Sequence, residues 1–478
     1  MKIMLEFGNT GLSKKITIVL LSCILIFFSL IVVYLSVTTN VRFLFIFLTA
    51  LLIPFLFLVN VERVIMFLLF YYVLMGFIRR FFYLFNPYIK YDPTYIIPDI
   101  FILIYFVYVL ITKKQSILKN IKENLGFKIF LLLFLIIVIQ MFNPIQGGLI
   151  VGVGGGKFWL IPMLWVFFSM LLDQKGIEKI LIVVFLLGFI AALYGIKQAF
   201  WGFSGFEKKW LYYAVSVNKY ASLSVHSVIR PFSFFPSPHE YGTFLILTFV
   251  VGISLILCKK YRYQVLLILL LIFYALVLLS GRGGLFFIFF GFLFMLNLVS
   301  QRKRYTFGIT LMVLLFYVIV ASLVDYKFNL SAIPVGIPRL YTHVISGILD
   351  PFAKTSTIWA RIYLIKNLPN TIAKYPLGVG IGATSLAGWK FGGLTALGEV
   401  PLVSLIKGGG VLAGLLYVFL VVLAIKNGVI KYNKYKKWIY VVITGIIFTY
   451  FLGGSLTLYS TTPVYWLCIG YILRKDEK

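Results

Sequence analysis

The feature that most constrains this chain is a series of apolar runs about 20 residues long, the length that crosses a ~30 Å hydrocarbon layer as a helix. The runs recur from Ile16 to Leu473. Charged residues make up only 12% of the chain, against about 25% in a soluble globule. The sequence therefore predicts an all-α, multi-pass membrane protein. The first run, 16–36, lacks a small-x-small cleavage site and is predicted to be a retained helix rather than a signal peptide.

The runs predict about fourteen transmembrane helices in one membrane domain, residues 1–478. The predicted ranges are 16–36, 43–60, 64–82, 96–112, 127–144, 158–172, 180–200, 241–258, 264–281, 284–300, 307–325, 397–425, 438–456 and 460–473. Basic residues concentrate on cytoplasmic loops, so we place Lys14 and Lys15 in the cytoplasm. This count brings the other basic clusters to the same side: Lys113–Lys114, Lys175/Lys179, Lys259–Arg262, Arg302–Arg304, Lys431–Lys437 and Arg474–Lys475. Both termini are then cytoplasmic, and two long loops, 201–240 and 326–396, are extracytoplasmic.

The net charge of +30 would suggest nucleic acid as the partner of a soluble protein. In a multi-pass protein much of it sets the topology, so no nucleic-acid partner is predicted. The three cysteines lie in or beside apolar runs without metal-like spacing, so we expect no disulfide, metal site or cofactor. The predicted outer side still carries more basic than acidic residues. Either a basic cavity attracts an anionic ligand there, or the charges attract anionic membrane lipids.

Arg282 is the clearest candidate for chemistry, because it separates two apolar runs in the stretch LLSGRGGLFF. Only small residues surround it, so the two runs are predicted to form a tight outward hairpin. A guanidinium supplies a fork of donors that matches phosphate oxygens, and glycines let the backbone approach a ligand closely. The alternative is that Arg282 snorkels to lipid headgroups or closes a structural salt bridge.

A second candidate stretch, RPFSFFPSPHEYGTF, starts at Arg230 and leads into the apolar run 241–258. Its prolines predict a rigid, non-helical approach to that helix. His239 and Glu240 stand at the helix N-terminus, where backbone N–H groups lack partners. Both are candidate substrate contacts. The alternatives are helix capping for Glu240 and an ordinary interfacial position for His239.

The loop 326–396 contains TSTIWARIYLIKNL, predicted to be a short amphipathic helix at the membrane interface that carries Arg361. The following stretch, KYPLGVGIGATS, is not a nucleotide-binding loop, because no strand–turn–helix unit surrounds it. Glu399 is either a general base beside a basic cavity or an acid favoured by a helix dipole. Lys157 and Lys197 either line the same cavity or snorkel to the interface.

Taken together, several motifs carry a resemblance. In chain order they are YGIKQAFWG (194–202), the Arg-led stretch 230–244, the Ser-Gly-Arg-Gly hairpin 280–284, the Arg361 helix followed by PLGVGIG (376–382), and a glycine-marked helix at 410–414. Between Lys157 and Tyr417 the chain thereby resembles the superfamily of O-antigen ligases and Wzy-type polymerases, which assemble bacterial envelope glycans such as lipopolysaccharide, capsule and exopolysaccharide.

The resemblance implies a GT-C-like glycosyltransferase of the bacterial cytoplasmic membrane, with its active site on the extracytoplasmic side and no metal or cofactor. The implied donor is a glycan on undecaprenyl diphosphate, whose anomeric carbon is attacked with inversion by a hydroxyl of an acceptor sugar. Arg230 and Arg282 match the arginine positions of the family, and Arg361 is a third. Membrane lipids, a flippase and a chain-length regulator are the further partners that it implies.

One departure from the family bears on the reaction. Ligases carry a histidine eleven residues ahead of a Gly-x-x-Gly motif, whereas Glu399 stands at that distance from Gly410, and Ala413 replaces the later glycine. This favours a polymerase that elongates repeat units, with Glu399 as the base or with no strong base. A ligase is the runner-up. A transporter or flippase of the lipid-linked glycan is the rival from another class.

Overall fold

The computed structural model describes Thr49 and residues 60–85, 92–216, 223–225, 227–258, 262–300, 333–349, 357–396 and 400–474. The predicted spans 16–36 and 307–325, most of 43–60, and Glu399 lie outside these residues. The helices are α5 (Val61–Phe82), α6 (Ile97–Thr112), α7 (Lys114–Glu123), α8 (Leu125–Gln140), α9 (Leu149–Met163), α10 (Trp165–Ser169), α11 (Gln174–Trp201), α12 (Gly205–Ser216), α13 (Pro238–Leu257), α14 (Arg262–Leu278), α15 (Arg282–Val299), α17 (Ile337–Leu349), α18 (Thr357–Lys366), α19 (Leu368–Lys374), α20 (Leu386–Lys390), α21 (Pro401–Tyr435), α22 (Trp438–Gly453) and α23 (Thr462–Leu473). Two short strands, β1 (Ser224–Val225) and β2 (Val228–Ile229), form an antiparallel pair.

Within these described ranges, five helices are long and apolar enough to cross a membrane, or six if the bent pair α6 and α7 forms one span. The five are α5, the α9–α10 unit, α11, α13 and α21. Shorter apolar helices lie beside them: α8, α14, α15, α22 and α23. The predicted all-α membrane class is confirmed. The total of about fourteen spans and the GT-C-like arrangement stay predictions.

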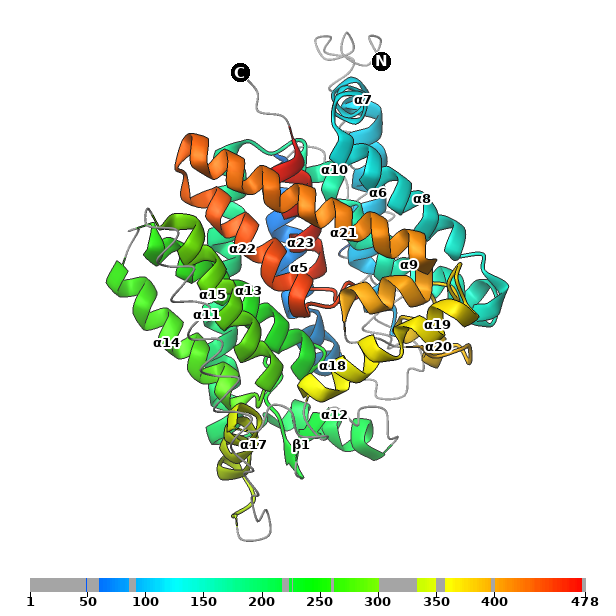
Figure 1. Cartoon of the computed structure of the whole chain (residues 1–478). Helices are drawn as coiled ribbons and strands as arrows, with labels where there is room; N and C mark the ends of the chain where they lie inside the picture. Colours follow the sequence, from blue (N-terminus) through cyan, green and yellow to red (C-terminus); the bar gives the residue numbers. More distant parts are fainter. Residues whose placement is uncertain are drawn as a thin grey trace, which may run out of the picture.

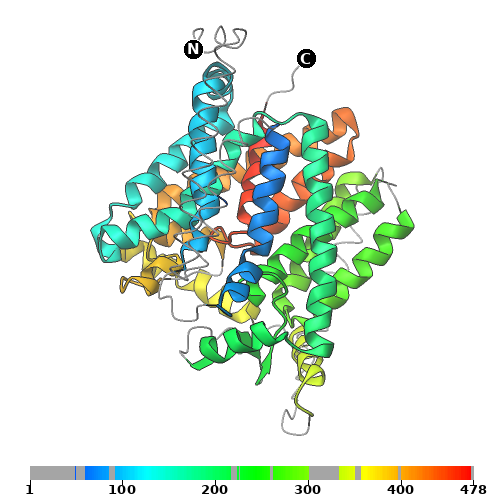
Figure 2. The same cartoon turned by 180° about the vertical axis from the view of Figure 1, so that it is seen from behind.

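One end of the bundle gathers some of the basic side chains that were expected to share a side, whereas Lys14, Lys15, Lys259, Lys260 and Arg302–Arg304 lie outside the described residues. At the start of α11, Gln174 accepts a hydrogen bond from Lys437 (2.5 Å), and Lys179 pairs with Glu62 of α5 (2.9 Å). Figure 2 shows α5 and α11 side by side. Arg474 donates to the carbonyl of Leu172 at this same end. Figure 1 shows α7 and the end of α23 along this edge, with α12, β1 and α17 at the opposite edge.

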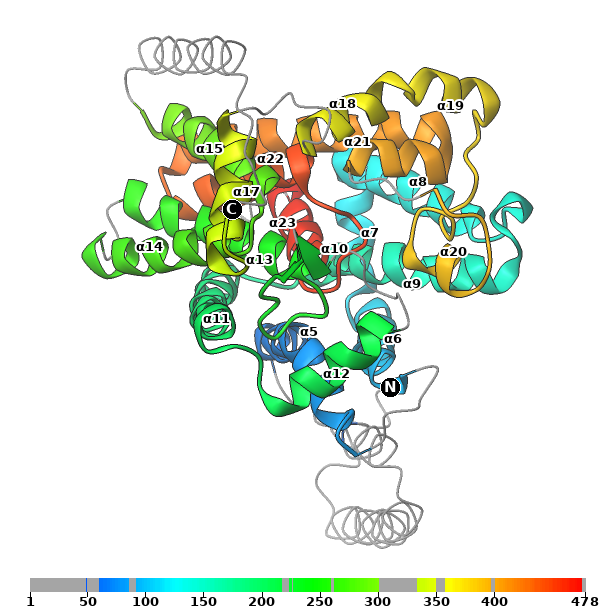
Figure 3. The ribbon, with the colours of Figure 1, turned by 90° about the horizontal axis from the view of Figure 1, so that it is seen from below.

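The opposite end, which we call the α12 end, is built from the two predicted long loops. Loop 201–240 forms α12 and the β1–β2 pair, and loop 326–396 contributes α17 to α20. Figure 3, seen from this end, shows α12, α18 and α20 around the margin of the bundle and α17 in front of α15. The sequence predicted one short helix in the second loop, near α18. Helix α17, an amphipathic helix over 337–349, was not predicted, because the part of the loop before the α18 region was expected to contain no helix.

Side-chain burial divides the bundle into central and peripheral helices. The side chains of α22 and α23 are buried almost throughout, and α13 is nearly as enclosed. Peripheral helices expose large apolar residues instead, among them Leu135 of α8, Leu270 of α14 and Leu415 of α21. An apolar outer surface around a buried core is what a lipid environment favours.

Helix α21 is broken at Gly410, whose backbone has φ 83° and ψ 175°. The stretch 376–382 fills the break. Val379 and Gly380 donate backbone hydrogen bonds to the carbonyls of Lys407 (2.8 Å) and Gly408 (3.1 Å), and Val411 donates to the carbonyl of Pro376 (3.1 Å). PLGVGIG is therefore a non-helical segment whose backbone bonds to helical groups left open by the break.

Gly378 tests how tightly this segment is packed. It has φ +87°, and a Cβ there would lie 2.6 Å from the backbone nitrogen of Gly410. Gly378→Ala should lower the free energy of unfolding by about 1–2 kcal/mol through backbone strain and about 1–3 kcal/mol more through overpacking. Gly392→Ala is the matched control, because Gly392 has φ +73° with open space around it. Thermal unfolding in detergent should show the larger loss for Gly378→Ala; equal losses would contradict the packing described here.

Candidate functional site

The candidate site lies at the α12 end, where the Arg-led stretch passes from β2 into α13. A buried polar network holds this stretch against α5 and α11. Arg80 donates to the carbonyls of Ser233 (2.5 Å) and Phe235 (2.7 Å). The side-chain oxygen of Gln198 accepts from the backbone nitrogens of Phe232 (3.0 Å) and Ser233 (2.7 Å). The approach to α13 is thus fixed by side chains as well as by its prolines.

The network also contains a buried ion pair. The Nε atom of Arg80 lies 3.9 Å from Glu207 of α12, and the two residues are 1% and 0% exposed. Gln198 donates to the same carboxylate (2.7 Å). At Gly76 of α5 the backbone of this stretch comes so close that a Cβ would lie 2.3 Å from the carbonyl carbon of Phe235. Contacts this close leave the stretch little freedom to shift relative to α5.

Arg230 opens the stretch at the end of β2. Its backbone nitrogen donates to the carbonyl of Leu223 (2.9 Å). Burial lowers the pKa of the Arg230 guanidinium from its ordinary value. Arginine side chains keep their proton in proteins, so the group is a cation at neutral pH. The structure therefore places a partly buried cation beside the entry to α13.

His239 and Glu240 differ in their surroundings. Ser237 caps α13 by accepting from the backbone nitrogen of Glu240 (3.2 Å), and His239 is exposed. The Glu240 side chain is buried and accepts a hydrogen bond from Ser460 (3.4 Å), in the loop between α22 and α23. His239 is therefore exposed at the start of α13, whereas the Glu240 carboxylate is buried against the loop between α22 and α23. Their predicted role in substrate binding stays a prediction.

The predicted hairpin at Arg282 is present, because α14 ends at Leu278 and α15 begins at Arg282. The side chain of Arg282 lies outside the described part of the structure. Ser280 in the turn has φ 58° and donates to the carbonyl of Leu340 in α17 (3.2 Å). The tyrosine hydroxyls of Tyr274 and Tyr341 lie 3.0 Å apart beside this contact. Helix α17 thus packs against the hairpin that carries Arg282.

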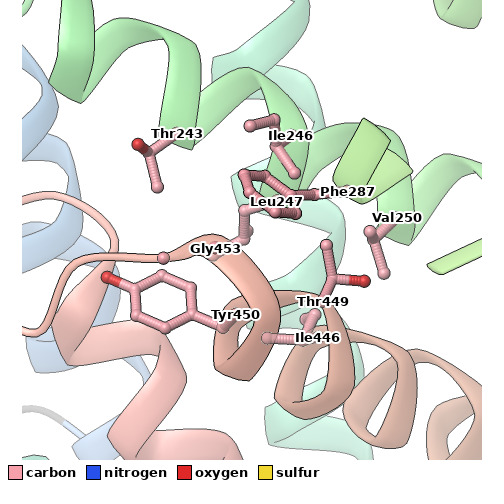
Figure 4. A pocket seen from close by; sticks show the side chains of 10 residues that line it. Thr243, Ile246, Leu247, Val250, Phe287, Ile446, Thr449, Tyr450 and Gly453 are labelled. Carbon is pink, nitrogen blue, oxygen red and sulfur yellow. The ribbon is translucent and has the colours of Figure 1, made fainter. Parts of the chain in front are cut away.

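Arg361 of α18 lies over α15. Its guanidinium carbon is 4.5 Å from the centre of the Phe287 ring, a cation–π contact. Phe287 also lines a small cavity between α13, α15 and α22, which encloses about 300 Å³ including space open to the outside. Its lining, drawn in Figure 4, is Thr243, Ile246, Leu247, Val250, Phe287, Ile446, Thr449, Tyr450, Gly453 and Gly454. Arg361 of α18 therefore packs against α15, the helix that begins at Arg282, next to a mainly apolar cavity.

The two predicted lysines have protein partners. Lys157 pairs with Asp99 of α6 (3.1 Å) and donates to the carbonyl of Tyr95 (2.8 Å). Lys197 donates to the carbonyl of Gly202 (3.0 Å) and to the hydroxyl of Ser204 (3.0 Å). These two bonds attach the residues that follow α11 to its last turns. These contacts give both lysines a structural role, and substrate binding by either stays a prediction.

Sequence reasoning missed two charged groups at this end. One is the Arg80–Glu207–Gln198 network described above. The other joins Arg79 to Asp92 (3.0 Å) and Lys157 to Asp99, with Tyr95 stacked on Tyr459 (5.5 Å between ring centres). The arginine pair 79–80 at the end of an apolar run was a visible signal. The partners of Arg80 lie far along the chain, and no sequence spacing identifies them.

In comparisons with known proteins, no protein-family model matches the chain, and no curated protein matches it. Within the described ranges, no three His, Cys, Asp or Glu side chains are grouped as metal ligands would be.

Proposed function

We propose that this protein is a membrane glycosyltransferase that polymerises undecaprenyl-diphosphate-linked repeat units into a surface polysaccharide. The reaction would take place at the α12 end, on the outer side of the bacterial cytoplasmic membrane, with both termini in the cytoplasm. The proposal includes about fourteen spans in a GT-C-like arrangement. It rests first on the ordered motifs of the sequence.

The observation that carries the proposal is the position of Arg361. It packs on Phe287 of α15, the helix that begins at Arg282, and Arg230 lies at the same end of the bundle. The leaving group of this reaction is a lipid diphosphate, on which negative charge builds as the glycosidic bond breaks. Fixed guanidinium groups stabilise such charge and bind phosphate oxygens in pairs. Arg230, Arg282 and Arg361 would supply them, and Glu399 would act as the base where one is needed.

The alternatives differ in acceptor or in class. A ligase would use the same donor and pass the glycan to another acceptor; Glu399 in place of the family histidine disfavours it. A flippase would need a polar path through the membrane. The ion pairs of Arg79, Lys157 and Lys179 instead lie toward the two ends of the bundle.

Deleting the gene in its host separates these three functions. Loss of a polymerase should leave single repeat units on the outer side of the membrane. Loss of a flippase should trap them on the cytoplasmic side, and loss of a ligase should leave long polymer on the lipid carrier. Protease-free membrane vesicles of known orientation, probed with a glycan-binding lectin, report the side; gel electrophoresis of the released glycan reports the length. Long polymer in the deletion strain would rule out the polymerase.

A further inference from the structure

Lys407 is a basic side chain in the first half of α21, three residues before the break at Gly410. It lies in one of the helices long and apolar enough to cross a membrane, and it is only partly exposed. A cation in such a helix is costly and is a functional candidate by default.

Other basic residues near the α12 end have partners in the protein. Arg79 pairs with Asp92, Arg80 with Glu207, and Lys157 with Asp99. Lys197 donates to a carbonyl and a hydroxyl. Among the residues that the structure describes, no carboxylate, hydrogen-bond acceptor or aromatic ring contacts the ammonium of Lys407. Lys407 thus differs from these four residues, because no group in the described part of the structure compensates its charge.

The helix break does not account for this charge. A lysine near the end of a half-helix can compensate open carbonyl groups. Here the carbonyls of Lys407 and Gly408 already accept backbone hydrogen bonds from Val379 and Gly380. These carbonyls are satisfied by backbone, so the ammonium is not needed to compensate them.

We propose that Lys407 binds a phosphate group of the lipid-linked diphosphate substrate. This inference rests on the proposed function and adds a residue that neither the motifs nor the resemblance singled out. An ammonium is a compact charge with three donors, which suits a phosphate oxygen where the planar fork of arginine is not required. The break in α21 lets the backbone bend at the level of this side chain.

Binding of farnesyl diphosphate to the purified protein in phosphatidylcholine nanodiscs tests the proposal. Lys407→Gln should weaken binding about tenfold or more, as expected for loss of one charge-assisted hydrogen bond, and Lys407→Arg should retain most of it. Lys426→Gln is the control, because Lys426 is an exposed lysine on the other side of the break in the same helix. It should bind as the wild type does. Equal affinity of wild type and Lys407→Gln would overturn the proposal.

Two further experiments test whether misfolding of the variant or binding of a lipid headgroup explains the result. In the wild type, farnesyl diphosphate should slow the reaction of Lys407 with an amine-reactive reagent and leave Lys426 unaffected, a readout that needs no variant. If Lys407 held a lipid headgroup instead, phosphatidylglycerol in the nanodisc would lower wild-type affinity to that of Lys407→Gln, which would overturn the substrate assignment. A wild type that binds farnesyl diphosphate through Lys407 but builds no polymer would overturn the proposed function alone.

Discussion

Arg80→Leu is expected to lower the free energy of unfolding by about 3–5 kcal/mol, because it leaves the buried carboxylate of Glu207 without its cation. The substitution also removes two hydrogen bonds to the carbonyls of Ser233 and Phe235. The stretch that carries Arg230 would then lose its main attachment to α5. Thermal unfolding of the purified protein in detergent measures the loss.

Two control variants sharpen this prediction. Lys179→Leu breaks an ion pair with Glu62 in which the lysine side chain is 58% exposed, and it should cost no more than about 1 kcal/mol. The double variant Arg80→Leu/Glu207→Leu should be less destabilised than Arg80→Leu alone, because no unpaired charge stays buried. An Arg80→Leu protein that unfolds like Lys179→Leu would show that the network does not hold this end together.

Arg361→Ala should slow polymer formation about 100-fold or more, the order of magnitude for removing one fixed donor from a developing anion. Protein abundance and the unfolding temperature should change little, because Arg361 lies on α18 at the margin of the bundle. The initial rate of chain growth from a defined lipid-linked repeat unit is the quantity to measure.

Lys366→Ala is the matched control for this substitution, because Lys366 is an exposed basic residue of the same helix. It should polymerise at the wild-type rate. Arg361→Lys should recover only part of the activity, since lysine keeps the charge but cannot bind two phosphate oxygens as a planar fork. A wild-type rate in Arg361→Ala would remove this residue from the mechanism.

Much of the helical framework could be predicted from apolar runs, because a helix in lipid satisfies its own backbone and needs only length and composition. Predicted spans within the described ranges fall on helices, with 158–172 divided between α9 and α10. The turn before Arg282 could also be predicted from adjacent residues, because glycines and a serine separate two apolar runs there. The break in α21 was not predicted, because its cause is a distant segment, 376–382, that bonds to the open backbone.

The site was less predictable for the same reason. Arg80 and Ser233 are separated by 153 residues and Gln198 and Ser233 by 35, so no periodicity links them. Among the described residues, the lack of a partner for the Lys407 ammonium could be recognised only once the partners of the other cations were known. By contrast, the capping role of Ser237 could be read from the sequence, because its partner is three residues away.

The most direct test of the proposed polymerase is to incubate the purified protein with a defined undecaprenyl-diphosphate oligosaccharide and separate the products on a gel. A polymerase should produce a ladder whose steps equal one repeat unit, without added metal or nucleotide. Inactivated protein should leave the single repeat unchanged. A single band from folded protein, with the substrate recovered intact, would contradict the proposed function.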